Sequence, residues 1–336
     1  YFSMDLHIKP SSGIPKFRQI ANQVTGLITS GRLKVGDKLP SIDQISAHTG
    51  VARQTVVQAY KHLKVNGMID SSKTRGFYVQ ANVSRELRRV MVLFNIMSPS
   101  KEIIYNTLAT ELRDKAQLEL FFYNYSSEMF ENIIRSSADR FHYFIIMPHY
   151  EPASAAILRV IPPEKLILID WPLSKPIEGA SAVYQDFKMD VFEALMLERQ
   201  SISRYKRIVL LFPEGKKQIA GIKEGIAKFG AKQKLPVSVR KAAEKELLTP
   251  GTLFITITDE QLITLIELQQ QTRWKLGREI GLISYNESPF KRILAGGIAT
   301  LSSDFEQMGK TAAACILQET TRVMRNPFKL IKRSSL

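Results

Sequence analysis

Five polar side chains, with no acidic residue among them, fall on one face and the first turn of a helix predicted between Ala52 and Val65. Side chains of these types donate hydrogen bonds to base edges and phosphate oxygens, and a helix of this size fits the major groove of B-DNA. An ordinary helix with a solvated polar face is the alternative, and the helix alone does not separate the two interpretations. The five residues are Arg53, Gln54, Thr55, Gln58 and Lys61.

The helix is predicted to belong to a small helical bundle. Its apolar residues Val56, Tyr60 and Leu63 recur at helical spacing and form a stripe that is expected to be buried. Ser41, with Gln44 three residues later, forms a capping box that begins the preceding helix. The two helices are therefore expected to pack against each other at a short turn.

The residues on either side complete a recognisable unit. Gly50 can adopt the positive φ that ends the preceding helix, and a first helix is predicted between Ile14 and Ser30. Strands are predicted to start at Met68 and at Gly76 and to form a hairpin, or wing. Helix, turn, helix and wing in this order favour DNA binding over a plain three-helix core.

Positive charge is concentrated in the same part of the chain. The net charge is +15 over 336 residues. Residues 1–89 contain 14 Lys and Arg against 5 Asp and Glu, which leaves +9 in about a quarter of the chain. Such asymmetry is typical of a nucleic-acid-binding end. A membrane surface would also attract this charge, but no basic amphipathic anchor accompanies it.

Composition excludes several other classes of protein. The length suits two or three domains. A single cysteine, Cys315, excludes intrachain disulfides and cysteine-cluster metal sites. No signal peptide and no run of about 18 apolar residues is present, so we expect a cytoplasmic protein. We find no catalytic triad, P-loop or histidine pair at metal-binding spacing, so we expect no enzyme activity, cofactor or metal.

The motifs LPS, TGVARQTV and LKVNGMI, followed by TRGFYV, occur in this order between residues 39 and 79. Over residues 10–80 the sequence resembles the winged-helix domain of the GntR family of bacterial transcription regulators. The resemblance implies that the wing and the first residues of the recognition helix contact operator DNA. The predicted contacts are Lys38, Ser41, Arg53, Gln54, Thr55, Gln58, Arg75 and Gly76.

One position departs from the pattern of that family. The family commonly has Glu-Arg after LPS, and that Arg touches DNA, whereas this chain has Ile42-Asp43. One usual contact is therefore missing, and Asp43 would repel phosphate if it stayed close to the DNA. We expect the operator contacts to depend more heavily on Arg53, Gln54 and Arg75.

From residue 90 onward, short apolar runs alternate with helical stretches. Such alternation predicts βαβ units and parallel sheets, and the near-continuous apolar character predicts sheets covered on both faces. The runs are RVMVLFNI, LELFFYNY, YFIIMPH, KLILIDW, AVYQDF, RIVLLFP, TLFITITD and EIGLISYN. Ligands of such sheets bind beyond the carboxyl ends of the strands. This rule selects residues 95–101, His149, Asp170-Trp171, residues 216–218, Asp259 and Asn286-Glu287.

The order of motifs in residues 89–336 is similar to that of the effector domain of LacI/GalR repressors and of periplasmic sugar-binding proteins. The similarity is strongest from Thr252, through FITITDEQ, REIGLISYNESPF and GGIATLSSDFEQMGKTAAACIL. It implies two α/β subdomains joined by three crossovers, with a sugar in the cleft between them. We therefore expect an α/β protein with a winged helix-turn-helix at residues 4–80, a linker at 81–88 and a periplasmic-binding-protein-like effector domain at 89–336.

The predicted ligand contacts combine the strand-end rule with this resemblance. Asp170 follows LILI, Asp259 follows FITIT and Asn286 follows LISY, as the family pattern implies. Gln218 stands where the family has an Arg and Ser303 where it often has Gln, so two positions depart from the family pattern. The predicted set is Ser98, Ser100, His149, Asp170, Trp171, Gln218, Asp259, Asn286 and Ser303.

Two residues of this set keep alternative interpretations. Trp171 is suited to stack on a sugar face, but packing between the subdomains explains it nearly as well. His149 follows a strand and is either a ligand contact or a plain loop histidine.

The whole sequence predicts a transcription regulator that binds operator DNA as a homodimer, with recognition helices about 34 Å apart. A sugar or sugar derivative would be the effector, and we expect repression that the ligand relieves. The alternative is a cytoplasmic solute-binding receptor without direct gene control, which the winged helix argues against. No membrane partner is expected.

Overall fold

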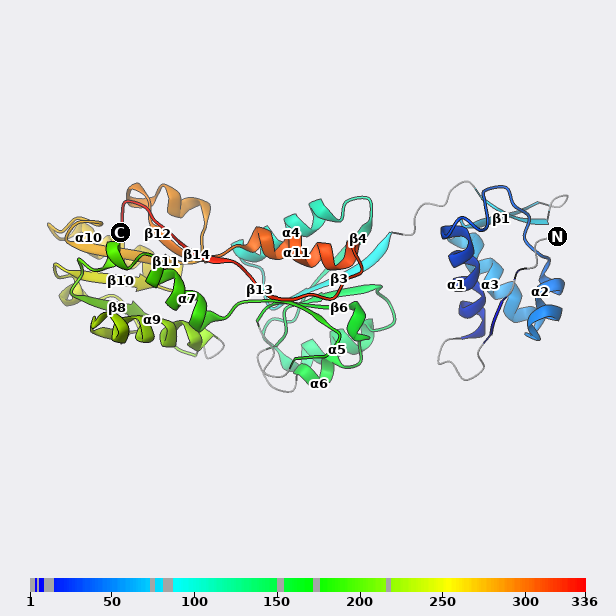
Figure 1. Cartoon of the computed structure of the whole chain (residues 1–336), viewed down its shortest axis with the longest axis horizontal. Helices are drawn as coiled ribbons and strands as arrows, with labels where there is room; N and C mark the ends of the chain where they lie inside the picture. The colour runs from blue at the N-terminus through cyan, green and yellow to red at the C-terminus, as the bar shows by residue number, and fades with distance from the viewer. Residues whose placement is uncertain are drawn as a thin grey trace. The chain divides into compact units, whose positions relative to one another are not determined.

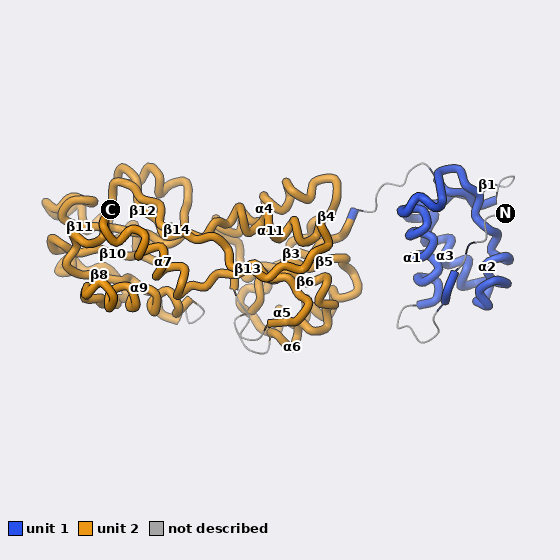
Figure 2. The backbone as a smooth tube through the Cα atoms, viewed as in Figure 1, with its two compact units in different colours: residues 1–87 blue, residues 88–336 orange. Residues whose placement is uncertain are grey.

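The computed structural model describes residues 4, 6–8, 15–72, 76–80, 87–149, 154–171, 176–215 and 219–336. The chain divides into two compact units, residues 1–87 and residues 88–336 (Figure 2). Helices and strands are labelled as in Figure 1. None of the helices in these described ranges is long and apolar enough to cross a membrane.

The first unit is the predicted winged helix-turn-helix. Its helices and strands, in order, are α1 (Lys16–Thr29), α2 (Ile42–Thr49), α3 (Arg53–Val65), β1 (Ile69–Ser72) and β2 (Gly76–Val79). The strands pair antiparallel with Ile69 opposite Val79. The predicted capping box is present, since Ser41 Oγ accepts from Gln44 N at 3.2 Å and Gln44 Oε1 accepts from Ser41 N at 2.7 Å. Gly50 ends α2 with a φ of 64°, as expected.

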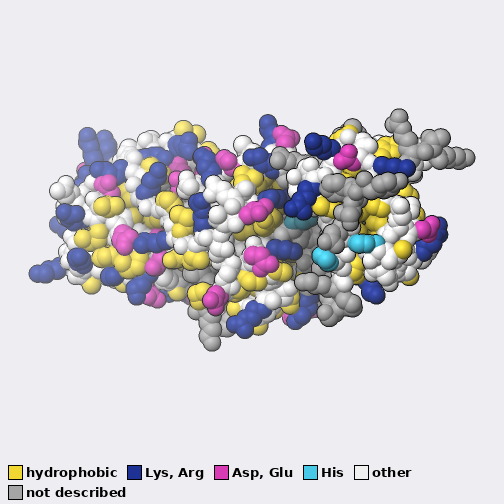
Figure 3. All heavy atoms as spheres, turned by 45° about the vertical axis from the view of Figure 1, so that its right-hand side comes forward, with side chains coloured by type: hydrophobic (Ala, Val, Ile, Leu, Met, Phe, Trp, Pro, Cys, Tyr) yellow, Lys and Arg dark blue, Asp and Glu magenta, His cyan; other side chains and the backbone are white. Residues whose placement is uncertain are grey.

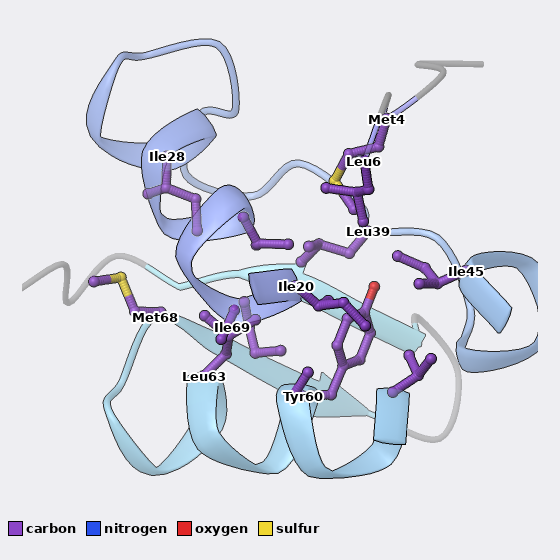
Figure 4. Packing of buried hydrophobic residues seen from close by; sticks show 14 of the residues in the cluster. Met4, Leu6, Ile20, Ile28, Leu39, Ile45, Tyr60, Leu63, Met68 and Ile69 are labelled. Carbon is purple, nitrogen blue, oxygen red and sulfur yellow. The ribbon is translucent and has the colours of Figure 1, made fainter. Parts of the chain in front are cut away.

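Apolar side chains from all three helices and the wing form one core (Figure 4). The stripe of α3 that was predicted to be buried is indeed buried at Val56, Tyr60 and Leu63. The Tyr60 hydroxyl donates to Pro40 O at 2.7 Å, which fastens the segment before α2 to α3. That segment also pairs with the wing, because Leu39 N donates to Phe77 O at 2.9 Å.

The second unit contains two six-stranded sheets within its described residues. The first sheet has the strand order β13-β7-β6-β5-β3-β4 and is parallel. Its strands are β3 (Arg88–Phe94), β4 (Ala116–Phe122), β5 (Tyr143–Ile146), β6 (Leu166–Asp170), β7 (Ser181–Tyr184) and β13 (Val323–Arg325). Helices α4 (Pro99–Glu111) and α11 (Phe305–Leu317) pack on one face, and α5 (Ser127–Ser137) and α6 (Ser154–Leu158) on the other.

The second sheet has the order β14-β12-β11-β10-β8-β9, in which only the β12–β14 pair is antiparallel. Its strands are β8 (Arg207–Leu211), β9 (Val237–Arg240), β10 (Thr252–Thr256), β11 (Ile280–Tyr285), β12 (Ala299–Ser303) and β14 (Phe328–Ile331). Helices α7 (Phe187–Leu197) and α9 (Ala220–Gln233) cover one face and α10 (Asp259–Gln270) covers the other, while α8 (Arg199–Ile202) follows α7.

Coverage on both faces explains the near-continuous apolar runs. Along β3, Val90, Val92 and Phe94 belong to one core cluster, whereas Met91 and Leu93 belong to the cluster on the other face. Every one of these side chains is fully buried. The sequence prediction of doubly covered parallel sheets is therefore confirmed.

The described chain passes between the two sheets at residues 185–186, at residue 304 and at residues 326–327 (Figure 1). The first passage leads from β7 to α7, the second from β12 to α11 and the third from β13 to β14. These are the three crossovers that the resemblance implied. Because β7 and β12 end at crossovers, the carboxyl ends of the strands in both sheets lie on the crossover side.

Candidate nucleic-acid interface and ligand site

The start of α3 presents polar side chains to solvent. Arg53, Gln54 and Gln58 are exposed and Thr55 is half-buried, whereas the opposite face of the helix is packed in the core. The residue that precedes the helix, Ala52, provides no side-chain cap. The exposed first turn is therefore available to an external partner.

The structure brings Lys38 to the wing. Lys38 forms a β-bridge with Tyr78, and its Cε lies 3.7 Å from the position that a Cβ on Gly76 would take. Gly76 has a φ of +73°, which favours glycine at this bend. Arg75, the other predicted wing contact, lies outside the described residues. Ser41 is exposed but its hydroxyl caps α2, so its contact with DNA stays a prediction.

Asp43 forms an exposed ion pair with Arg53. Its Oδ1 accepts a hydrogen bond from Arg53 Nε at 2.8 Å, and the two side chains are 75 and 65 % exposed. The sequence interpretation treated Asp43 only as a source of repulsion and missed the pair. Asp43 belongs to α2 and Arg53 to α3, so the spacing rules that apply within a single helix do not predict this pair.

The visible face in Figure 3 shows Lys and Arg side chains spread across the surface with Asp and Glu side chains between them. In the first unit, all the described lysines and arginines are exposed, namely Lys16, Arg18, Arg32, Lys34, Lys38, Arg53, Lys61 and Lys64. The excess of positive charge in this unit is therefore at its surface, where it can attract phosphate.

In the second unit, Asp170 is the last residue of β6 and lies at a φ of +70°. Its side chain is buried, and Gln185 Nε2 donates to its Oδ1. Burial raises the pKa of Asp170 above its ordinary value, while the positive charge of Lys101 and the bond from Gln185 oppose that rise. Lys101 is itself buried in the first turn of α4. Asp170, Lys101 and Gln185 thus form one polar group at the carboxyl end of the sheet.

The predicted serines lie at the start of the same helix. Ser98 is the N-cap residue of α4, and its Oγ lies 3.0 Å from Ser100 Oγ. Lys101, whose charge acts on Asp170, follows Ser100 directly in the chain. Lys101 and Gln185 were not singled out as ligand contacts, although the strand-end rule had included residue 101.

An aromatic pair stands beside this group. The rings of Tyr125 and Trp171 are stacked, with centroids 6.4 Å apart and planes at 24°. His149 is buried beneath the loop that carries Tyr125, and its Nε2 lies 3.1 Å from Tyr125 O. The imidazole also contacts the rings of Tyr123 and Phe130. His149 therefore supports the position of Tyr125, a residue that the sequence interpretation missed.

In the second sheet, a buried lysine joins two predicted residues. Lys291 Nζ lies 2.9 Å from Asp259 Oδ1 and donates to Asn286 O and Tyr285 O, both at 2.9 Å. Its side chain is 2 % exposed, and burial lowers its pKa despite the neighbouring carboxylate of Asp259. Lys291 was not predicted, because it follows β11 by six residues rather than standing at its end.

Asn286 resembles Asp170 in standing at the carboxyl end of a strand with a positive φ. It follows β11 directly and has a φ of +60°. Its buried Oδ1 has no hydrogen-bond partner among the residues that the structure describes. An amide oxygen left in this state would gain from a ligand that donates a hydrogen bond.

Tyr285 is the last residue of β11 in the second sheet. Its ring is buried, and its hydroxyl has no hydrogen-bond partner within the described ranges. Burial first, and then the negative charges of Asp170 and Asp190, raise its pKa far above the ordinary value. Because Asp170 belongs to the first sheet and Tyr285 to the second, the polar ends of both sheets influence each other.

The remaining predicted residues differ in their surroundings. Ser303 ends β12, and its Oγ accepts from Asn326 Nδ2 at 2.8 Å, which ties two crossovers together. Glu287 pairs with Arg333 at 2.9 Å and with Thr300, so its carboxylate is directed to the C-terminal segment. Gln218 and the lysines before it lie outside the described residues. In the described ranges, no group of three or more His, Cys, Asp or Glu side chains is placed to hold a metal ion.

Comparison with known proteins assigns the first unit. Residues 16–79 match the family described as bacterial regulatory proteins, gntR family. The chain is 35 % identical over 82 residues to the HTH-type transcriptional repressor YtrA of Bacillus subtilis, a match that covers 24 % of this chain and 63 % of YtrA. It is 38 % identical over 66 residues to the mannosyl-D-glycerate transport/metabolism system repressor MngR of Escherichia coli, covering 20 % of this chain and 28 % of MngR. The chain thus spans less than two thirds of these relatives.

The second unit resembles solved structures of another group. A LacI family transcriptional regulator from Lactobacillus casei with bound glucose superposes with a TM-score of 0.59 at 17 % identity, over 74 % of this chain and 99 % of that one. A transcriptional regulator CelR–cellobiose complex gives a TM-score of 0.59 at 14 % identity, over 89 % of this chain and all of that chain. At these identities the likeness concerns the fold.

These findings agree with the family resemblances seen in the sequence. The family matched by residues 16–79 consists of regulatory proteins. The N-terminal unit is thus a winged helix-turn-helix that matches the gntR family of bacterial regulatory proteins, and the second unit has a fold similar to that of LacI family regulators.

Proposed function

We propose that this protein is a transcription regulator that binds operator DNA as a homodimer and changes its DNA affinity when a small sugar-like effector binds residues 88–336. Repression relieved by the effector is the expected mode, since the named relatives YtrA and MngR are repressors. A regulator of this kind acts in the cytoplasm, where it meets DNA. The proposed domains are residues 4–80 and 88–336, joined by a linker, because Arg88 is already the first residue of β3.

The observation that carries the DNA-binding part is the exposed first turn of α3, a helix whose residues Tyr60 and Lys64 contact the wing. Arg53, Gln54 and Gln58 project from a helix whose opposite face is buried, and Lys38 lies next to Gly76 of the wing. A helix that enters the major groove reads bases with the residues of its first turns. Lys38 and the wing would contact the phosphates on either side.

Polar groups at the strand ends support the sugar-like effector. Asp170 at the end of β6, Gln185 in the first crossover and Asn286 directly after β11 provide oxygen and amide groups that suit hydroxyl recognition. The stacked rings of Tyr125 and Trp171 offer an apolar surface for a sugar face. Closure of the two subdomains around a ligand would favour one arrangement of the paired DNA-binding units over another.

The DNA-binding part is tested by selecting duplexes from a randomised library with the full-length protein. We expect an approximately palindromic sequence with half-sites about one helical turn apart. Arg53→Ala should weaken binding of the selected duplex by about 1–3 kcal/mol in a fluorescence-anisotropy titration. Failure to enrich any sequence, or a monomer in light scattering of the complex, would contradict the proposal.

The effector part is tested by a thermal-shift screen of pentoses, hexoses, 6-deoxyhexoses and their phosphates, because a ligand of the folded state raises the melting temperature. Asp170→Asn and Asn286→Ala should abolish both the shift and the change in DNA affinity but leave DNA binding intact. Asp114→Asn is a matched control, since Asp114 has a φ of +60° but is exposed. A normal response in both variants would refute the assignment of the ligand site.

A further inference from the structure

Asp43 and Arg53 form a pair in which each residue lies in the first turn of a different helix. Asp43 lies in the first turn of α2, and Arg53 is the first residue of α3. Both side chains are mostly exposed, so the ion pair by itself contributes little to the stability of the fold. Because Arg53 lies at the start of the recognition helix, the pair also affects the direction in which its guanidinium group points.

The hydrogen bond engages one particular edge of Arg53. The donor is Nε, at 2.8 Å from Asp43 Oδ1. A guanidinium has five N–H groups in a planar fork, and the bond from Nε leaves the terminal Nη1 and Nη2 groups for an outside acceptor. Those terminal groups can donate to O6 and N7 of guanine in a bidentate contact. Base recognition by Arg53 is therefore compatible with retention of the bond to Asp43.

The charges of the pair separate base readout from phosphate binding. Asp43 offsets the positive charge of Arg53, which makes the pair a weak attractor for a phosphate. Hydrogen bonding to a base edge depends on the direction of the donors more than on net charge. An arginine also loses rotamer freedom when it is ordered, and a bond formed before DNA arrives reduces that cost on binding.

We propose that Asp43 is a positioning residue for base recognition: it holds Arg53 through Nε so that the terminal guanidinium groups read a guanine in each half-site of the operator. The inference rests on the proposed function, namely specific DNA binding by the first unit. The acidic residue then contributes specificity at one base pair, and its effect on affinity for unrelated DNA is small.

The test uses the full-length protein and the duplex enriched from the randomised library, together with all its single-base-pair variants. Affinities are measured for the wild type, Arg53→Ala, Asp43→Ala and Asp43→Asn. The amide introduced by Asp43→Asn would keep an oxygen that accepts from Nε but lose the charge, so the two substitutions of Asp43 separate hydrogen bonding from electrostatics. Asp37→Asn is the matched control, because it removes one negative charge from the same unit at a residue that bonds to Lys34 N instead.

Arg53→Ala should lower the preference for guanine at one position of the half-site by about tenfold or more. Asp43→Ala should lower the preference at that same position by at least about threefold, and Asp43→Asn should restore most of it. Asp37→Asn should leave the base preferences unchanged. The double variant Asp43→Ala/Arg53→Ala should show no further loss at that position beyond Arg53→Ala.

Two outcomes would overturn the inference. One is an unchanged base preference in Asp43→Ala at the position where Arg53→Ala loses it. The other is equal strengthening of binding to every duplex in Asp43→Ala and Asp43→Asn, which would make Asp43 a simple source of phosphate repulsion. If the library yields no enriched duplex, the proposed function itself fails, and that result is distinct from both outcomes.

Discussion

Asp190 connects the two subdomains of the second unit near their crossovers. It lies in α7, which follows the first crossover, and its Oδ1 accepts from Arg325 Nε of β13 at 2.5 Å. The Asp190 side chain is only 1 % exposed, and its Oδ2 has no hydrogen-bond partner among the described residues. Burial raises the pKa of Asp190 to about 6, although Arg325 opposes the rise.

The direction of the pKa shift of Asp190 determines how pH affects the stability of the fold. Because the pKa in the folded chain lies above the ordinary value of 3.8, folding favours the protonated form of Asp190. The resulting stabilisation is fully present below the ordinary value and is lost as pH rises through about 6. At about 1.4 kcal/mol for each pKa unit, the loss amounts to about 3 kcal/mol.

Asp190→Asn should remove this dependence, because an amide keeps an acceptor for Arg325 and carries no charge. Urea unfolding can be followed by tryptophan fluorescence, since both tryptophans, Trp171 and Trp274, belong to the second unit. We expect similar stabilities of variant and wild type near about pH 4 and a variant that is more stable by up to about 3 kcal/mol near about pH 7.

The control is Glu193→Gln, which removes the other carboxylate bound to Arg325, at 2.8 Å, but keeps Asp190. This variant should retain the wild-type dependence on pH. A constant difference in stability between Asp190→Asn and the wild type across this range would refute the reasoning, as would an Asp190→Asn variant that is less stable near neutral pH.

Two further substitutions test local features of the fold. Ser41→Ala removes the hydroxyl that accepts from Gln44 N, so the first unit should lose about 1 kcal/mol of unfolding free energy, measured by circular dichroism of the full-length protein; an unchanged melting curve of that unit would argue against the cap. Gly277→Ala places a Cβ 1.8 Å from Ser334 O at a φ of +74°, so it should cost more than about 2 kcal/mol, seen as earlier unfolding in the fluorescence of Trp274. A neutral effect would show that the C-terminal segment shifts freely, and Gly296→Ala, whose nearest contact is 3.4 Å away, provides the comparison.

Much of the architecture was predictable because its causes are local. The capping box at Ser41, the turn at Gly50 and the buried stripe of α3 depend on residues within one or two helical turns of each other. The apolar runs predicted eight strands of the second unit, and the structure has a strand in each of them.

Strands that depend on their neighbours escaped prediction. These are β9, β12, β13 and β14. β9, β13 and β14 are short edge strands that bury little, and β12, with the sequence ATLSS, is buried but rich in hydroxyl residues. Nothing in such segments favours extended structure as strongly as pairing with an existing strand does.

The proposed ligand site shows the same division. The strand-end rule selected Asp170, Trp171 and Asn286 as candidates, because the carboxyl ends of parallel strands meet at one edge. It did not reveal that Lys291 engages Asp259, or that His149 supports Tyr125. These relations join loops whose separation in space is decided by the packing of whole helices.

The sequence by itself determined the fold class of both units, the recognition helix and the edges of the sheets where a ligand would bind. It did so because periodicity, caps and turns follow from near neighbours. Only the tertiary structure decided which charges meet: Asp43 with Arg53, Lys291 with Asp259, and Asp190 with Arg325 across 135 residues. Such pairs depend on the burial and direction of side chains from separate elements, which no local pattern encodes.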